Sequence, residues 1–481
     1  MFVASHPFEP FDYLRVPYEV RTTGPRNQHH VGRLRRDGAG PESPSLLWAR
    51  PRVRSTGHHA GVFEVAGCRL AGRVSTAEPE PLPLDGAWRQ AWPVTDGEGQ
   101  VVSAVWRHDR GDVWLPFDPG AVMHCLWSED YHRLRPGTRA VSALRHLAVR
   151  GYYAVRPALP RQVQLVLRRR LASSGGKPGF PDWPLHTGLH DFYDWLLALA
   201  GEVAGEPVPW IRPWPEEARW CFVLTHDVET EEGLRRLASL REPEVERGYR
   251  SAWNFVPERY DTPPAVLADL EAQGCEVGVH GLRHDGRDLA SGRALAKRLP
   301  AIRAAAERWG ASGFRSPATQ RSWSLMPRLG FDHDSSYTDT DPYEPQPGGC
   351  CSYLPFFIDD LVELPITLPQ DHTLFSILGH EDSSLWLDKA RELRRRGGMV
   401  LVLSHPDYAH GAAARAWRDL LEEFHADTTV WQALPREVAS WWRERAGSRL
   451  VAHEGEWRVV GPAEGRARVA LGSVERPGSR T

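Results

Sequence analysis

The chain has 481 residues, of which 41% are hydrophobic and 25% are charged, and this balance excludes a disordered or fibrous protein. The length predicts two or three domains rather than one core. A formal net charge of −3 gives no general attraction to nucleic acid or to an acidic membrane. Six cysteines without a CxxC pair argue against a disulfide framework and against a cysteine-based zinc site.

The first part of the chain is expected to be mainly β. Residues 1–115 contain short alternating runs separated by proline and glycine, which is typical of strands and turns. The N-terminus has no basic start followed by an apolar stretch, and no run approaches the ~18 apolar residues of a membrane span. We therefore expect a cytoplasmic protein that does not insert stably into a membrane.

A helical connecting region is predicted at residues 116–206. Asp118 is expected to cap a helix whose first residue is Pro119. Two more helices are predicted at residues 139–155 and 160–172, before a linker rich in glycine and proline.

Residues 207–446 alternate strand-like runs with helical runs, which predicts a parallel α/β domain. The strand-like runs include CFVLT, SAWNFVP, CEVGVH, LVELPI and MVLVLSH. Residues 447–481 contain a further alternating stretch, so a short C-terminal β-hairpin extension is expected. In a parallel α/β domain, ligands gather at the carboxyl ends of the strands.

Residues with catalytic chemistry follow several of these predicted strands. CFVLT leads to Asp227 and Glu229, and CEVGVH ends at His280, with His284 four residues later. The later strand-like runs lead to Arg315, Asp334 and His405. His226 is not expected to take part, because the pleat of the strand points it away from Asp227.

These residue types suit one kind of chemistry. Two imidazoles and one carboxylate make a three-ligand site for zinc or a similar ion, with a position left for water, whose pKa the metal lowers toward ~7. A separate carboxylate could take the proton of that water, and a histidine across the cleft could protonate the leaving group. An arginine beside the base would hold it ionised. The set predicts metal-assisted hydrolysis of an amide or ester.

The order of the motifs over roughly residues 215–445 resembles the polysaccharide deacetylase family, carbohydrate esterase family 4. The motif THDVE resembles the cytoplasmic deacetylase-like members of that family. The resemblance implies a distorted (β/α) barrel that removes acetyl groups from N-acetylated sugars. It gives the chain as a whole an α/β fold, with a mainly β and helical N-terminal region and a short C-terminal β extension.

The resemblance also implies roles for individual residues. Asp227 would be the catalytic base, and Glu229, His280 and His284 would hold one divalent metal ion. That ion is expected to be zinc, with cobalt, nickel or manganese as alternatives. Glu229 stands where the family has a metal-binding aspartate, so its carboxylate sits one methylene further from the backbone. Arg315 would be the partner of the base, and His405 would be the general acid. Asp334 would be the carboxylate that tunes this acid. Pro317 and Tyr337 would contact the substrate.

Two other functions fit the same motifs. One is a catalytically inactive glycan-binding or scaffold protein, which the replacement at Glu229 favours and the retained base and acid positions oppose. The other is an amidase acting on a small non-sugar amide. The expected partner is an N-acetylated sugar or glycan precursor rather than a nucleic acid, and the oligomeric state is not predicted.

Overall fold

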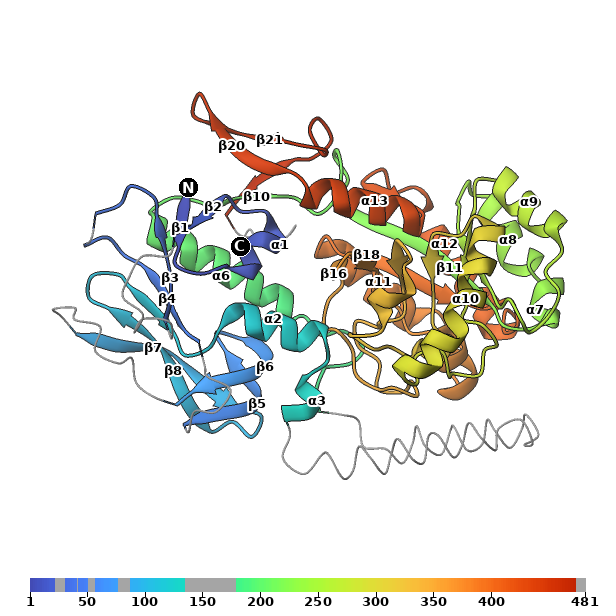
Figure 1. The fold of residues 1–481 in the computed structure, drawn as a ribbon, viewed down its shortest axis with the longest axis horizontal. Coiled ribbons are helices and arrows are strands. Elements are labelled where there is room, and N and C mark those ends of the chain that lie inside the picture. The colour runs from blue at the N-terminus through green and yellow to red at the C-terminus, as the bar shows by residue number, and fades with distance from the viewer. Residues whose placement is uncertain (22–30, 41, 51–56, 77–86, 135–178, 473–481) are drawn as a thin grey trace. The chain divides into compact units, whose positions relative to one another are not determined.

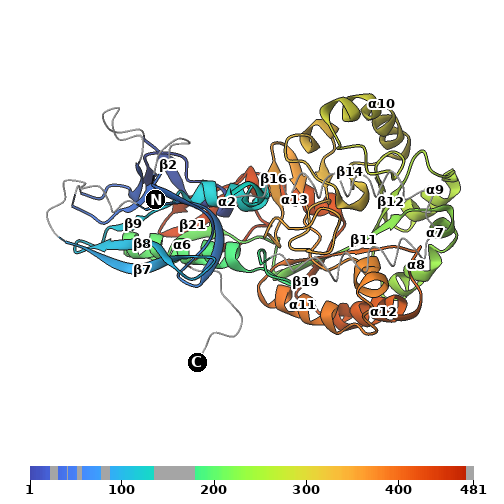
Figure 2. The ribbon, with the colours of Figure 1, turned by 90° about the horizontal axis from the view of Figure 1, so that it is seen from below.

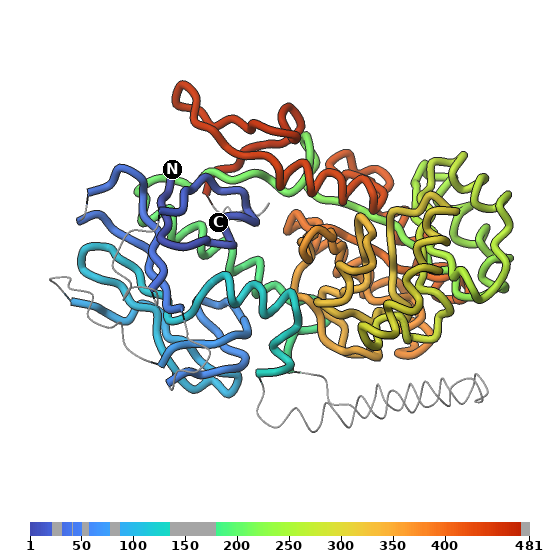
Figure 3. The backbone as a smooth tube through the Cα atoms, viewed as in Figure 1, coloured from blue at the N-terminus to red at the C-terminus, as the bar shows by residue number. Residues whose placement is uncertain are grey.

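The computed structural model describes residues 1–21, 31–40, 42–50, 57–76, 87–134 and 179–472. The chain divides into two compact units, one made of residues 1–141, 186–216 and 444–475, and the other of residues 142–185, 217–443 and 476–481. Figures 1 and 3 follow the chain through both units. The helices predicted at residues 139–155 and 160–172 lie outside the described residues, and the domain boundaries expected at residues 115, 206 and 446 stay predictions.

The first unit is built on one sheet with the strand order β2-β1-β3-β4-β9-β8-β7-β5-β6 (Figure 1). Its strands are β1 (Phe2–Ala4), β2 (Tyr18–Val20), β3 (Val31–Arg36), β4 (Leu46–Ala49), β5 (His58–Val65), β6 (Cys68–Ser75), β7 (Trp88–Asp96), β8 (Val101–His108) and β9 (Val113–Leu115). Its helices are α1 (Glu9–Leu14), α2 (Pro119–Trp127), α3 (Tyr131–Leu134) and α6 (Gly188–Ala204). Asp118 accepts hydrogen bonds from the backbone of Gly120 and Ala121, which confirms the predicted cap and the start at Pro119.

The same unit contains the end of the described chain. Strand β10 (Pro209–Ile211) pairs with β22 (Val469–Leu471) in an antiparallel arrangement. Strands β20 (Arg449–His453) and β21 (Glu456–Val460) form an antiparallel hairpin. A hairpin is therefore present where the sequence predicted one.

The second unit contains a largely parallel sheet with the strand order β16-β17-β15-β14-β13-β12-β11-β18, and β19 also pairs with β11. Its strands are β11 (Trp220–Val228), β12 (Ala252–Phe255), β13 (Glu276–Val279), β14 (Gly313–Phe314), β15 (His333–Asp334), β16 (Phe356–Ile358), β17 (Leu361–Glu363), β18 (Met399–Ser404) and β19 (Val430–Gln432). Only β16, paired with β17, is antiparallel to its neighbour among the described strands of this sheet. The alternating pattern therefore predicted the mixed α/β class correctly.

Helices surround this curled sheet on its outer side (Figure 2). They are α7 (Glu231–Arg235), α8 (Ala238–Val245), α9 (Pro264–Ala272), α10 (Gly292–Trp309), α11 (Ser384–Arg395), α12 (Gly411–His425) and α13 (Pro435–Ala446). Beyond β17 the chain continues to Thr367, whose backbone N–H donates to the carbonyl of Leu401 in β18 at 3.1 Å. Segments near the two ends of the strand order are therefore hydrogen-bonded to each other.

The central strand of this unit shows why the sheet can position a site. All nine residues of β11 are buried, as expected for a parallel strand that is covered on both faces. Its neighbour β12 carries Asn254, which lies in register with Gly278 of β13. A Cβ atom at Gly278 would lie 2.0 Å from Asn254 Oδ1, so the glycine provides the space for this side chain.

Among the described residues, no helix is long and apolar enough to cross a membrane.

Candidate functional site

The site lies at the carboxyl end of β11, where the strand changes from apolar to polar residues. Asp227 is 1% exposed and points to the same side as Thr225, while His226 points to the opposite side. His226 Nδ1 lies 2.9 Å from Ser404 Oγ, and its Nε2 lies 2.7 Å from Glu244 Oε1. This confirms the predicted orientation of His226, whose contacts are those of a buried structural residue.

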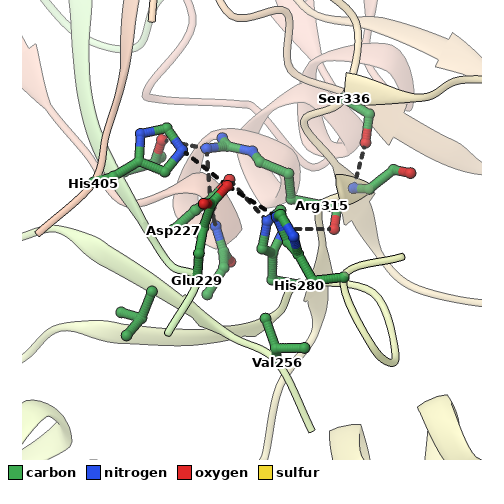
Figure 4. Close-up of polar contacts among 12 residues, drawn as sticks. Asp227, Glu229, Val256, His280, Arg315, Ser336 and His405 are labelled. Atoms are coloured by element: carbon green, nitrogen blue, oxygen red, sulfur yellow. Dashed lines mark hydrogen bonds and ion pairs between the residues drawn. The ribbon is translucent and has the colours of Figure 1, made fainter. Parts of the chain in front are cut away.

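Three potential metal ligands meet beside this strand end. Glu229, His280 and His284 each offer one ligand atom, and these atoms all lie within 4.8 Å of one another. Figure 4 shows Glu229 and His280 next to Asp227. His284 Nε2 is 2.9 Å from Glu229 Oε1. The three residues that the sequence predicted as a ligand set therefore lie together in the structure.

The donor atoms of this cluster suit a divalent ion. His280 Nδ1 lies 3.1 Å from the carbonyl oxygen of Arg315, which fixes the ring and leaves Nε2 directed at the cluster. That Nε2 is buried and makes no hydrogen bond to the described residues. Burial lowers the pKa of His280 to about 4, so its imidazole is neutral near pH 7, as a ligand must be. Two imidazoles and a carboxylate fit zinc well.

Asp227 lies next to this cluster but keeps its own partners. Asn254 Nδ2 donates to Asp227 Oδ1 at 2.9 Å, and Arg315 Nη1 lies 3.4 Å from the same oxygen. The other oxygen, Oδ2, is 3.6 Å from His280 Nε2. Burial by itself would raise the pKa of Asp227, but His280 and Arg315 beside it hold the pKa below its ordinary value. The carboxylate is thus kept ionised, as a base requires.

Arg315 connects Asp227 to the rest of the sheet. Its Nη1 donates to Thr225 Oγ1 at 2.9 Å, its Nε donates to the carbonyl of Ser335 at 2.7 Å, and its Nη2 donates to Ser335 Oγ at 2.8 Å. The guanidinium is 1% exposed. These bonds fix Arg315 beside Asp227, in the place that the sequence motif implied for a partner of the base.

His405 lies on the other side of the cluster and has a carboxylate partner that the sequence analysis missed. Its Nδ1 is 2.6 Å from Asp371 Oδ1, and its backbone N–H donates to Asp371 Oδ2 at 2.8 Å. Burial by itself would lower the pKa of His405, but Asp371 raises it to about 10. His405 Nε2 lies 3.9 Å from Glu229 Oε1. The histidine is therefore oriented and protonated, with Nε2 directed toward the potential metal ligands.

The expectation that Asp334 tunes His405 is wrong, because Asp371 makes that contact. Asp334 is in register with Glu363 on the neighbouring strand, so their two carboxyl groups adjoin each other in the interior. Burial raises the pKa of Asp334 to about 6, and burial together with Asp334 raises that of Glu363 well above its ordinary value. Glu363 Oε1 also accepts hydrogen bonds from the backbone of Ser336 and Tyr337. Asp334 thus belongs to a buried carboxyl pair within the sheet.

The cluster opens into a cavity of about 480 Å³, its mouth included, which is lined by Asp227, all three ligand residues and His405. The predicted contacts Pro317 and Tyr337 are not among the described residues that line it. Pro317 packs against Gly281, where a Cβ atom would approach the proline ring to 2.6 Å. Tyr337 is 1% exposed and packs against Phe356. Neither prediction of a substrate contact agrees with the structure, since packing in the interior takes up both side chains.

Glu229 is held by two residues that follow His405. Tyr408 donates from its hydroxyl to Glu229 Oε2 at 3.0 Å, and Asp407 Oδ2 accepts from the backbone N–H of Glu229 at 3.0 Å. Asp407 also bonds the side chain of Thr230. The longer side chain of Glu229 is thus fixed at its backbone and at one oxygen, and its other oxygen faces His284.

We expect Tyr408→Phe to weaken zinc affinity by about tenfold to a hundredfold, because loss of a hydrogen bond to a ligating carboxylate has effects of this size. Competition with a chromophoric chelator measures the affinity. Tyr18→Phe is the matched control, since Tyr18 also donates to a carboxylate, Asp12, but belongs to the first unit. Equal zinc affinity in Tyr408→Phe and the wild type would show that this bond does not position Glu229.

Several solved structures are similar to part of this chain. No family model matches the sequence, and no curated protein matches it. A protein from Mycobacterium smegmatis assigned as a polysaccharide deacetylase is 20% identical, with a TM-score of 0.40 over 50% of this chain and 96% of the other. A probable polysaccharide deacetylase from Pseudomonas aeruginosa PAO1 is 18% identical, with a TM-score of 0.39 over 47% and 92% of the two chains. PuuE allantoinase is 17% identical, with a TM-score of 0.40 over 48% and 93%. Likenesses at this level carry no assignment of activity.

Proposed function

We propose that the chain is a metal-dependent hydrolase that removes an acetyl group from an N-acetylated sugar or glycan precursor. One observation carries the proposal. Three ligand atoms lie within 4.8 Å of one another, in a cavity that also contains a separate carboxylate, Asp227, and a histidine, His405, that is paired with Asp371. This is the minimal set for hydrolysis of an unactivated amide, which needs a base for the water and an acid for the amine.

Glu229, His280 and His284 would hold the ion, and zinc suits their donor atoms best. When bound, such an ion supplies Lewis-acid polarisation of the acetamide carbonyl and makes a water molecule more acidic. Asp227 is then placed to accept the proton of the attacking water, while Arg315 and Asn254 keep its carboxylate oriented.

His405 completes the reaction on the leaving-group side. Cleavage of the amide C–N bond requires a proton on the departing nitrogen, and His405 Nε2 faces the cavity while Asp371 fixes Nδ1. Acetate leaves with the oxygen of the water, and the sugar leaves as a free amine. Asp371 is the positioning residue for this step, in place of Asp334.

We further propose that the second unit is a distorted (β/α) barrel of the polysaccharide deacetylase type. Its strand order, its outer helices and the hydrogen bond from Thr367 to Leu401 support this proposal. A closed arrangement would bring the strand ends that carry Asp227, His280 and His405 around one opening, as the shared cavity requires.

The proposed function predicts that His405→Ala will lower the rate for an acetylated amine and for an acetyl ester by different amounts. We expect kcat for N-acetylglucosamine to fall about 10²–10⁴-fold, because the amine must be protonated as it leaves. The loss for phenyl acetate should be much smaller, since phenolate leaves without a proton. Acetate release measures both rates, with His453→Ala, at an exposed position of the hairpin, as the control. Equal losses for amide and ester would remove His405 from the acid role.

A further inference from the structure

A polar wall of the cavity has no part in the chemistry described above. It consists of Thr319, Glu344, Gln370 and Thr373, which all line the cavity and are between 2% and 7% exposed. Thr373 Oγ1 donates to Glu344 Oε1 at 2.7 Å, so the wall has a fixed internal contact. The remaining polar atoms of the wall decide what it can bind.

Two of these atoms are buried without a partner. Gln370 Nε2 and Thr319 Oγ1 make no hydrogen bond to the described residues. A buried amide or hydroxyl group without a partner is costly, and such groups in native proteins are normally satisfied by water or by a ligand. Thr319 also has a φ of 49°, which is rare for a β-branched residue and is found where the surroundings enforce it. These features indicate a built binding surface.

The wall lies on the leaving-group side of the site. Gln370 directly precedes Asp371, which bonds both the ring and the backbone of His405. Thr373 belongs to the π-helix His372–Ile377, which begins next to Asp371. Since His405 protonates the departing amine in the proposed reaction, the group attached to that amine must lie near His405. The wall is thus placed to contact the amine portion of the substrate rather than its acetyl group.

The charge of the cavity further restricts which kind of group can be attached to the departing amine. No lysine or arginine is among the described residues that line the cavity, the protonated His405 is paired with Asp371, and Glu344 adds a carboxylate to those of Asp227 and Glu229. The buried Lys389 is 2.8 Å from Asp339 Oδ2 and is neutralised there. A phosphate or a uronate would find no cationic partner on this wall.

We propose that Gln370, Thr319 and Glu344 bind hydroxyl groups of the sugar that carries the acetamide, so that the substrate is an uncharged N-acetylhexosamine unit. This inference rests on the proposed function and makes its substrate class specific. Gln370 supplies donors, Glu344 supplies an acceptor, and Thr319 supplies either. A substrate without ring hydroxyls leaves these groups unpaired, and such mismatches are strongly selected against.

The test compares three probes on the zinc-loaded full chain: N-acetylglucosamine, N-cyclohexylacetamide, which has the same ring size without hydroxyls, and N-acetylglucosamine 6-phosphate. Acetate release gives kcat/KM, and calorimetry gives Kd for each probe whether or not it is hydrolysed. The variants are Gln370→Met, which keeps side-chain length, and Glu344→Gln, which keeps an acceptor for Thr373. Gln273→Met, at an exposed position on the second unit, is the matched control.

We expect the wild type to prefer the sugar over the cyclohexyl compound by about a hundredfold or more. Gln370→Met should reduce this preference by about tenfold or more in both kcat/KM and Kd, and the control should not. Glu344→Gln should narrow the preference for the neutral sugar over its 6-phosphate. A wild type without preference, or a Gln370→Met variant that keeps the preference within twofold, would overturn the inference.

The same data separate this inference from the proposed function. If no probe is hydrolysed but the sugar binds and Gln370→Met weakens its binding selectively, the proposed hydrolase is wrong and the hydroxyl-binding wall is supported. If the sugar is hydrolysed but neither variant changes the preference among probes, the hydrolase is supported and the wall is wrong. Absence of both turnover and binding overturns both.

Discussion

Asp227→Asn is expected to lower kcat for acetamide hydrolysis by about 10²–10⁴-fold while the protein still binds one equivalent of zinc. The amide cannot accept the proton of the attacking water, and removal of a general base has effects of this size. Its carbonyl oxygen can still accept from Asn254 Nδ2, so the local structure should persist. Acetate release from N-acetylglucosamine measures the rate, and metal analysis after gel filtration measures the zinc content.

The control for this variant is Asp269→Asn, at an exposed position on α9 where Asp269 pairs with Arg241. It should keep wild-type turnover and zinc content. Near-normal turnover in Asp227→Asn would show that another group takes the proton. Loss of zinc together with turnover would instead make Asp227 a ligand rather than the base.

Asp371→Asn is expected to lower kcat by about 10²–10⁴-fold, whereas Asp334→Asn should stay within about threefold of the wild type. Asparagine at position 371 removes the charge that supports the protonated ring of His405 and allows the wrong tautomer to form. Asp334 adjoins Glu363 in the interior, so asparagine there removes one member of a carboxyl pair without touching His405. Both variants replace an aspartate by asparagine, so they make the same chemical change at two different positions.

Two measurements distinguish positioning from a general loss of structure. The pH dependence of kcat should change in Asp371→Asn, because the pKa of His405 depends on that carboxylate. The melting temperature of each variant shows whether the fold is retained. If Asp334→Asn lost activity and Asp371→Asn retained it, the carboxylate partner of His405 would have to be reassigned to Asp334.

The strand ends were the part of the site that the sequence could predict. In a parallel sheet, residues beyond the carboxyl ends of neighbouring strands meet at one edge, so Asp227, Glu229, His280 and His405 could be grouped without coordinates. The strand period of two also predicted that His226 points away from Asp227. These predictions succeed because they depend on local periodicity and on a general rule of sheet topology.

The residues that were assigned wrongly depend on contacts that are not local, whereas Asp371, which was missed, carried a local signal. Asp371 follows the apolar run that continues from β17 and so resembles another strand end, a signal that was present in PQDHT. Asp334 also stands at the end of a strand, β15, but its register with Glu363 places it in a buried pair. Pro317 and Tyr337 were expected in the cavity, and packing against residues distant in sequence turns them into the interior. Such contacts cannot be read from a short motif.

The most direct test of the account is a zinc titration of the metal-free protein, in which acetate release from N-acetylglucosamine is measured at each step. For the wild type, the rate should rise in proportion to added zinc up to one equivalent and then stay constant. Asp227→Asn should bind the same equivalent and show at most about one hundredth of that rate. Acetate release by metal-free protein that does not change with zinc would contradict a metal centre at Glu229, His280 and His284.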